Sequence, residues 1–251
     1  MGKNEVAVVN ESTDLTVAGV PAPFGIEISK EDMMIPFIKV IQSLSEEVMQ
    51  GKDKFNPDVR PGDIYDSVTQ TIFKNAKAIV CGLKKYYAEW TPEVRGKLVG
   101  KHPVTSDVVK NAVRTEKKTD KGQSFYQLST PEGNELVETY GLVLLIKTED
   151  GLPLPAVLTL AKTSFMVGKQ LSTVIAIHQA KGTPVFKMGT VGVSNSKGSW
   201  YKPTFVFDGY EKDSEVIGMA AEISKLTDSI LYRKEEDASE TTVEVVEDNI
   251  L

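Results

Sequence analysis

The sequence contains few of the residues that cross-link a chain or bind a metal ion. Its 251 residues include one cysteine, Cys81, and two histidines. A single cysteine excludes an internal disulfide, and these side chains are too few for a structural zinc site. We therefore expect no metal, no cofactor and a reducing compartment such as the cytoplasm.

Long apolar runs are also missing. The longest, such as Gly141 to Ile146, are too short to span a bilayer, and no apolar stretch of the signal-peptide type follows Met1. Both absences predict a protein that makes no membrane contact and stays in the cytoplasm, where it is made.

Common enzyme motifs are absent as well. The sequence has neither a P-loop nor a G-x-G-x-x-G fingerprint, and the segment Gly189 to Gly192 lacks their remaining glycines and lysine. The nearest approach to a metal site is Asp58 with Glu116-Lys117-Lys118, which could hold Mg²⁺ in a nuclease. Both acids lie in polar, loop-like stretches rather than on buried strands. We therefore expect a protein that is not an enzyme.

Acidic residues are unevenly distributed along the chain. Residues 1–34 hold six of the 35 acids and two of the 29 bases, and residues 235–251 hold seven acids and no base. Residues 35–234 therefore keep 27 bases and 22 acids, a net charge of +5. Between Asp150 and Asp208 there is no acid, where the average frequency predicts about eight. This stretch either faces a polyanion or is a buried β segment that avoids charge.

Hydrophobic periodicity predicts a mainly β fold with α-helices. At 41% apolar residues, the chain can bury one substantial core. The expected strands lie at 35–42, 76–90, 124–128, 136–147, 154–162, 184–193 and 199–207, and the expected helices at 165–180 and 213–233. Residues 91–122 are rich in bases and weakly periodic, so we expect a long loop there, either solvated or in contact with a partner. We expect a flexible N-terminal arm at 1–30, one domain at 31–234 and a disordered acidic tail at 235–251.

The order of these elements indicates an OB-fold-like architecture. That fold is a five-stranded barrel with a helix between strands 3 and 4, here with extra N-terminal elements and a C-terminal helix. In strand 76–90, alternation predicts a core face with Ile79, Cys81 and Leu83 and an outward face with Val80, Lys84, Tyr86 and Trp90. In strand 199–207, it predicts Phe205 and Phe207 in the core and Trp200 and Lys202 outward.

Nonspecific binding of single-stranded nucleic acid needs cations that contact phosphates and aromatic faces on which bases stack. The candidate phosphate contacts are Lys84, Lys162, Lys169, Lys187, Lys197 and Lys202. The candidate stacking residues are Tyr86, Trp90 and Trp200, each of which could instead be an ordinary partly buried aromatic residue.

Three features occur together: the OB-like order over roughly residues 70–210, the acid-free segment 151–207, and the acidic tail that ends in Ile250-Leu251. Together they resemble a bacteriophage single-stranded DNA-binding protein. The segments Ile35 to Ser45 and Pro61-Gly62-Asp63 are also similar to phage-encoded proteins.

The resemblance implies a function and partners. It implies binding of single-stranded DNA without sequence specificity during phage DNA replication or recombination in the host cytoplasm. It also implies that the tail competes with DNA for the basic groove and recruits replication or recombination proteins, and it makes a homodimer plausible. The implied tail residues are Glu244, Glu247, Asp248, Ile250 and Leu251. Phage tails of this kind often end in phenylalanine, so the terminal leucine departs from the pattern.

Two other functions remain open. The acidic ends could mimic DNA in a phage interaction protein that inhibits a host enzyme, and the acids at 58 and 116 could belong to a metal-dependent nuclease. Lack of DNA affinity in the tail-less domain would favour the first. Mg²⁺-dependent cleavage that is lost in Asp58→Ala would support the second.

Overall fold

The computed structural model describes residues 35–93, 96–118, 122, 124–147, 153–195 and 198–232. The chain divides into two units, residues 1–34 and 35–251, and all described residues belong to the second. The predicted arm at 1–30, the predicted tail at 235–251 and Lys197 lie outside the described residues.

The described part consists mostly of strands. These are β1 (Ile38–Val40), β2 (Ile64–Asp66), β3 (Lys77–Trp90), β4 (Leu98–Pro103), β5 (Val113–Lys118), β6 (Ser124–Ser129), β7 (Glu135–Lys147), β8 (Leu154–Ala161), β9 (Pro184–Asn195) and β10 (Gly198–Tyr210). The α-helices are α1 (Asp107–Lys110), α2 (Phe165–His178), α3 (Ser214–Lys225) and α4 (Thr227–Tyr232). Short 3₁₀ helices are η2 (Glu46–Val48), η3 (Lys162–Ser164) and η4 (Gln179–Lys181).

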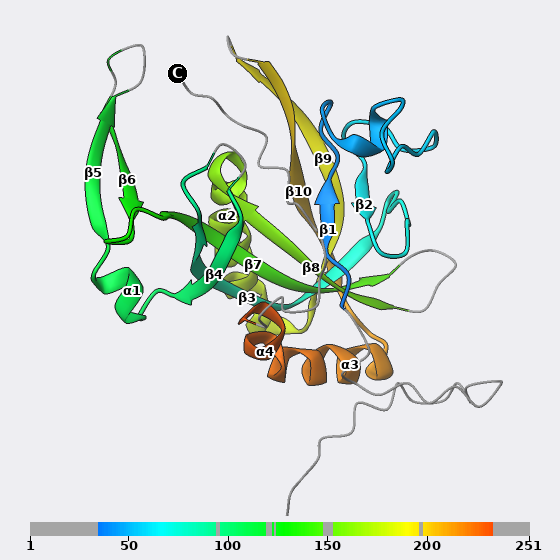
Figure 1. The fold of residues 1–251 in the computed structure, drawn as a ribbon. Helices are drawn as coiled ribbons and strands as arrows, with labels where there is room; N and C mark the ends of the chain where they lie inside the picture. The colour runs from blue at the N-terminus through cyan, green and yellow to red at the C-terminus, as the bar shows by residue number, and fades with distance from the viewer. Residues whose placement is uncertain are drawn as a thin grey trace, which may run out of the picture. The chain divides into compact units, whose positions relative to one another are not determined.

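Most strands belong to one open antiparallel sheet (Figure 1). Its order is β10-β9-β3-β7-β6-β5, with β4 also paired to β3 and β8 to β7, while β1 and β2 form a separate pair. The structure is therefore mainly β with a few helices, as predicted. No pairing between the described strands closes a barrel, so the OB-fold expectation is not confirmed. The order of elements along a chain does not specify which strands pair, and that pairing is what distinguishes a barrel from an open sheet.

The long strands and α2 lie where periodicity predicts them, but the expected loop at 91–122 is wrong. That stretch contains β4, α1 and β5. All six residues of β5 are exposed, so neither face of the strand is buried and the sequence carries no alternation of apolar and polar residues. Hydrophobic periodicity therefore cannot identify β5 as a strand.

The C-terminal helix predicted at 213–233 is two helices. The side chain of Asp213 accepts hydrogen bonds from the backbone N–H groups of Glu215 and Val216 and so caps α3. Leu226 then separates α3 from α4. Among the described residues, no helix is both long enough and apolar enough to cross a membrane.

Helices pack against the two faces of the sheet. On one face, α2 packs against a cluster of buried residues that includes Leu142, Leu144 and Phe186. On the other, α3 and α4 contribute to a second cluster with Val143 and Leu145. We call these the α2 face and the α3 face.

A β-bulge in β3 changes which residues point to each face. The register of β3 against β7 shifts between Val80 and Gly82. Val80 and Leu83 both pack on the α2 face. Cys81 packs on the α3 face, where Tyr86 contacts the ring of Tyr232 in α4. The predicted division, which put Cys81 with Leu83 and Val80 with Tyr86, is therefore wrong. A bulge places two residues opposite one, so alternation counted along the sequence shifts by one position.

Candidate nucleic-acid interface

β9 and β10 form a long hairpin that extends beyond the rest of the sheet (Figure 1). β3 pairs with β9 only over residues 185–187, and the backbone N–H of Met188 donates to the carbonyl oxygen of Ala76. Among the described strands, none pairs with β9 on that side beyond this point.

The outer edge of β10 is covered by a side chain. The amide Nε2 of Gln42 donates to the carbonyl oxygen of Tyr201 at 3.0 Å, and the Tyr201 N–H donates to Gln42 Oε1 at 2.8 Å. Two residues further along, Pro203 has no N–H to donate. Covered groups and proline both prevent an edge strand from pairing with another chain. This edge is thus closed to strand pairing, and a binding surface on the hairpin has to be one of its faces.

One face of the hairpin brings several predicted residues together. Val185 packs in the α3-face cluster, and alternation places Lys187 and Val191 on the same face. Their cross-strand neighbours share this face: Val206 is opposite Lys187, Lys202 is opposite Val191, and Trp200 is opposite Val193. We call Lys187, Val191, Trp200, Lys202 and Val206 the hairpin face. The predicted core residues Phe205 and Phe207 point the other way and pack on the α2-face cluster.

The hairpin face is partly apolar and carries only positive charge. Val206 is 62% exposed and Val191 48%, while Trp200 and Lys202 are half-buried. Within the described part of the chain, neither Lys187 nor Lys202 forms an ion pair. The Nε1 group of Trp200 is buried and has no acceptor among the described residues. A buried donor left without an acceptor typically destabilises a protein by about 1–3 kcal/mol, so this edge of the indole is a local cost to the fold.

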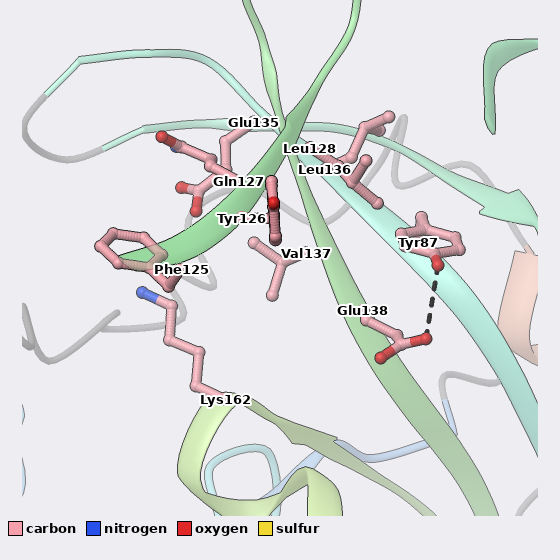
Figure 2. A pocket seen from close by; sticks show the side chains of 10 residues that line it. All are labelled: Tyr87, Phe125, Tyr126, Gln127, Leu128, Glu135, Leu136, Val137, Glu138 and Lys162. Atoms are coloured by element: carbon pink, nitrogen blue, oxygen red, sulfur yellow. Dashed lines mark hydrogen bonds between the residues drawn. The ribbon is translucent and has the colours of Figure 1, made fainter. Parts of the chain in front are cut away.

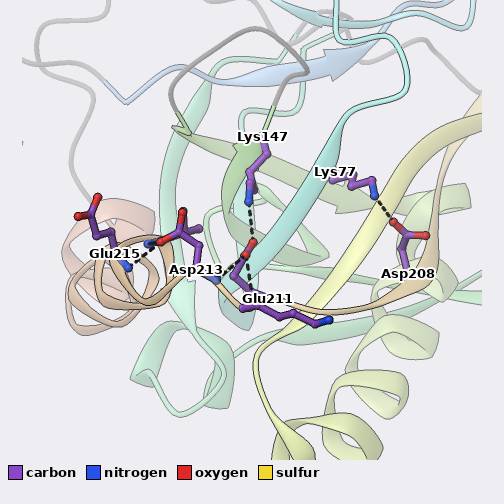
Figure 3. A network of polar contacts seen from close by, with 8 residues as sticks. Lys77, Lys147, Asp208, Glu211, Asp213 and Glu215 are labelled. Atoms are coloured by element: carbon purple, nitrogen blue, oxygen red, sulfur yellow. Dashed lines mark hydrogen bonds and ion pairs between the residues drawn. The ribbon is translucent and has the colours of Figure 1, made fainter.

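The first acid after the acid-free stretch is neutralised by a lysine. Asp208 pairs with Lys77 at 2.7 Å, as Figure 3 shows. The hydrogen bond and the charge of Lys77 lower the pKa of Asp208, and the charge of Lys187 contributes. The carboxylate therefore stays ionised and paired, and it cancels little of the positive charge further along the hairpin.

The structure places the remaining predicted residues elsewhere. Lys84 lies on the α3 face and pairs with Asp228 of α4 at 3.2 Å. Lys162 is the first residue of η3, directly after the end of β8. Lys169 is exposed on α2. Trp90 is half-buried at the end of β3. The predicted residues thus do not form one continuous groove.

The prediction that Tyr86 faces outward is wrong. Its side chain is 1% exposed and packs edge to face against Tyr232, with ring centroids 6.0 Å apart. The bulge in β3 turns Tyr86 under α4, so its ring has no free face on which a base could stack.

The family described as Pam3 phage gp34-like protein matches residues 23–230. The chain belongs to this family. The matched range covers every described strand and reaches into α4. No curated protein and no solved structure matches the chain. Membership supports the phage part of the resemblance, while DNA binding stays a prediction.

In this Pam3 phage gp34-like protein, the two acids of the nuclease alternative lie on separate elements. Asp58 is exposed in the loop between η2 and β2, and Glu116 is exposed in β5. Nowhere in the described ranges do three or more His, Cys, Asp or Glu side chains gather as metal ligands would. The geometry of the described part thus gives the nuclease reading no support.

Sequence reasoning missed the ribbon formed by β5 and β6. Arg114, Lys117 and Lys118 lie on β5, paired with a strand that carries Phe125 and Tyr126. The bases were visible in the sequence, but the loop prediction separated them from the aromatic pair. Cross-strand pairing of 113–118 with 124–129 would have brought both together.

Proposed function

We propose that this phage protein binds single-stranded DNA without sequence specificity during phage DNA replication or recombination, and that it is not an enzyme. The observation that carries the proposal is the hairpin face, where Lys187, Trp200 and Lys202 lie together with no carboxylate in β9 or in β10 before Asp208.

This arrangement has the two components that sequence-independent binding needs. Lysines attract phosphates through a charge interaction that is independent of sequence. An aromatic ring stacks on any base, which is typically worth about 1–3 kcal/mol per base. The exposed Val191 and Val206 add apolar surface beside the lysines. A strand of DNA laid along the hairpin face would therefore meet both kinds of contact.

The resemblance supplies the rest of the proposal. The acidic tail regulates binding by competing with DNA for the hairpin face, and it recruits replication or recombination proteins through Glu244, Glu247, Asp248, Ile250 and Leu251. Two copies of the chain form a homodimer, and the protein acts in the host cytoplasm.

A fluorescence-anisotropy titration tests the proposal. Labelled oligo-dT and a matched duplex are titrated at low and high salt with Mg²⁺ present, and the oligonucleotides are then checked for cleavage. We expect salt-sensitive binding that favours the single strand, with no cleavage. Trp200→Ala should weaken binding by about 5- to 150-fold, the equivalent of one stacked base, and Lys202→Gln should reduce the salt dependence. Trp200→Phe, which keeps a ring, should retain most of the affinity.

The same titration distinguishes the alternatives. If neither the full chain nor a form without residues 235–251 binds DNA, the proposal is wrong and a protein partner becomes the better explanation. Mg²⁺-dependent cleavage that Asp58→Ala abolishes would instead establish a nuclease.

A further inference from the structure

The β5–β6 ribbon has no core of its own. Every residue of β5 is exposed, and of β6 only Gln127, Leu128 and Ser129 are half-buried. A two-stranded ribbon is marginally stable in water unless something packs against it. Within the described residues, only the last two residues of β6 pair with the sheet, at the start of β7. The ribbon thus presents two open faces.

The side chains on these faces include bases, aromatic rings and one acid, Glu116, which lies opposite Tyr126. Lys117 is opposite Phe125 in the register, so both share one face. Arg114 and Tyr126 share the other, where the guanidinium lies 3.8 Å from the ring centroid. Phe125 is 43% and Tyr126 57% exposed. None of the bases of β5 pairs with a carboxylate of the described chain. Cations beside exposed rings match the phosphates and bases of a single strand.

A notch lies at the base of the ribbon. β6 and β8 pair with the same edge of β7. The pairing with β6 ends at Leu136 and the pairing with β8 begins at Thr139, so Val137 and Glu138 pair with neither strand. The resulting cavity has a volume of about 400 Å³. Figure 2 shows Phe125 above it and Lys162 reaching toward that ring from the end of β8.

The charges in the notch leave Lys162 unopposed. The carboxylate of Glu138 is already engaged, by an ion pair with Lys85 and by a hydrogen bond from the Tyr87 hydroxyl at 3.3 Å. Glu135 is the other acid that lines the notch, and among the described residues no ion pair joins it to Lys162. Lys162 forms no ion pair with any described residue, so its ammonium group remains available to a phosphate.

We propose that the β5–β6 ribbon and the notch form a second binding surface for single-stranded nucleic acid. Phosphates contact Arg114, Lys117 and Lys118, and a base enters the notch beside Phe125 with its phosphate on Lys162. This inference rests on the proposed function and extends it, because the ribbon and the hairpin face lie at opposite ends of the sheet order. One strand of nucleic acid would then bind at two places.

A second copy of the chain is the rival occupant, since β5 is an edge strand. Lysines on an edge oppose strand addition, whereas the same lysines attract a polyanion. Protection of the edge explains the lysines but not the exposed Phe125 and Tyr126. A nucleic acid explains both.

The test compares two variants with the same change in net charge. The ribbon variant is Arg114→Gln/Lys117→Gln/Lys118→Gln, and the control is Lys52→Gln/Lys74→Gln/Lys212→Gln, all exposed positions. Each phosphate contact contributes about 0.7 to the slope of log affinity against log salt for a single strand. We expect the ribbon variant to lose about 2 from that slope, which is about a hundredfold in affinity for oligo-dT at 0.1 M salt. The control should lose far less.

Photocrosslinking of the wild-type protein to oligo-dT gives a second readout. Peptide mapping should find crosslinks at Phe125 or Tyr126 as well as near Trp200. If the wild type binds but the ribbon variant matches the control and no crosslink maps to the ribbon, the second surface does not exist and the hairpin face stands alone. If the variant changes only the oligomeric state, the ribbon is a subunit interface. If the wild type does not bind at all, this inference and the proposed function fail together.

Discussion

Lys147 and Glu211 form an ion pair between the end of β7 and the connection from β10 to α3 (Figure 3). Their charged atoms are 2.8 Å apart, and the Glu211 side chain is 9% exposed. Burial alone would raise the pKa of Glu211, but the hydrogen bond from Lys147 and those from the N–H groups of Asp213 and Lys212 outweigh it and lower that pKa. The folded state thus favours the ionised carboxylate.

This pair predicts a pH-dependent contribution to stability. Lys147→Met should lower the free energy of unfolding at pH 7 by about 1–3 kcal/mol, because it leaves a mostly buried carboxylate without its partner. A carboxylate whose pKa is lowered by folding stabilises the protein at pH values above its unfolded-state pKa, which is about 4.3 for glutamate. This stabilisation disappears as the pH falls through the folded-state pKa. Urea unfolding should therefore show a large difference between variant and wild type at pH 7 and a small one at pH 3.

The control for that prediction is an exposed pair. Lys225 and Glu222 lie 2.7 Å apart on α3, with side chains 67% and 53% exposed. Lys225→Met should change stability by no more than about 0.5 kcal/mol at either pH. An equal effect of both lysine substitutions would show that the burial of Glu211 is not what matters.

Single residues also show where reading the sequence succeeds and fails. The outward face of Trp200 and Lys202 and the inward face of Phe205 follow from alternation, because the register between β9 and β10 is regular from Gly198 to Phe207. Tyr86 was misplaced, because the register of β3 shifts at Gly82. Gly82 is the one local mark of that bulge, since a glycine inside a strand often accompanies one.

At the scale of elements, the contact between α4 and the sheet depends on glycine. A Cβ built on Gly82 would lie 2.1 Å from Thr227 Oγ1, and one on Gly141 would lie 2.8 Å from the Leu231 side chain. Both glycines are on the α3 face, beneath α4. The helix can approach this closely only because these strand positions carry no side chain.

A matched pair of glycine substitutions tests this contact. Gly82→Ala should lower the free energy of unfolding by about 1–3 kcal/mol, because Thr227 or the whole of α4 must move to admit the methyl group. Gly218→Ala, in the middle of α3, should raise it by about 0.5–1 kcal/mol, since no atom lies within 4 Å of that added Cβ. Urea unfolding followed by circular dichroism measures both. A neutral Gly82→Ala would mean that α4 packs less closely than the structure shows.

At the scale of the whole molecule, charge separates along the chain. The tail at 235–251 has seven acids and no base, while residues 35–234 have a net charge of +5. A tethered acidic segment reaches a basic surface at a high effective concentration. A tail that competes with DNA would therefore weaken DNA binding most at low salt.

Removal of residues 235–251 should thus tighten binding to oligo-dT, by about tenfold or more at low salt and by little at high salt. Anisotropy titrations of the full and shortened chains at two salt concentrations measure this. A shortened chain that keeps the acids but lacks Ile250-Leu251 is the control, and it should bind DNA as the full chain does. Equal affinities of all three forms would rule out competition by the tail.

The sequence by itself determined the mainly β class, the long strands and α2, because each of these depends on local periodicity. It also determined that Trp200 and Lys202 share a face. Only the tertiary structure decided the open sheet, the bulge that buries Tyr86, and the joining of β5 and β6 into an exposed ribbon. These features depend on which segments pair across the chain, and alternation within a single strand carries no information about its partner.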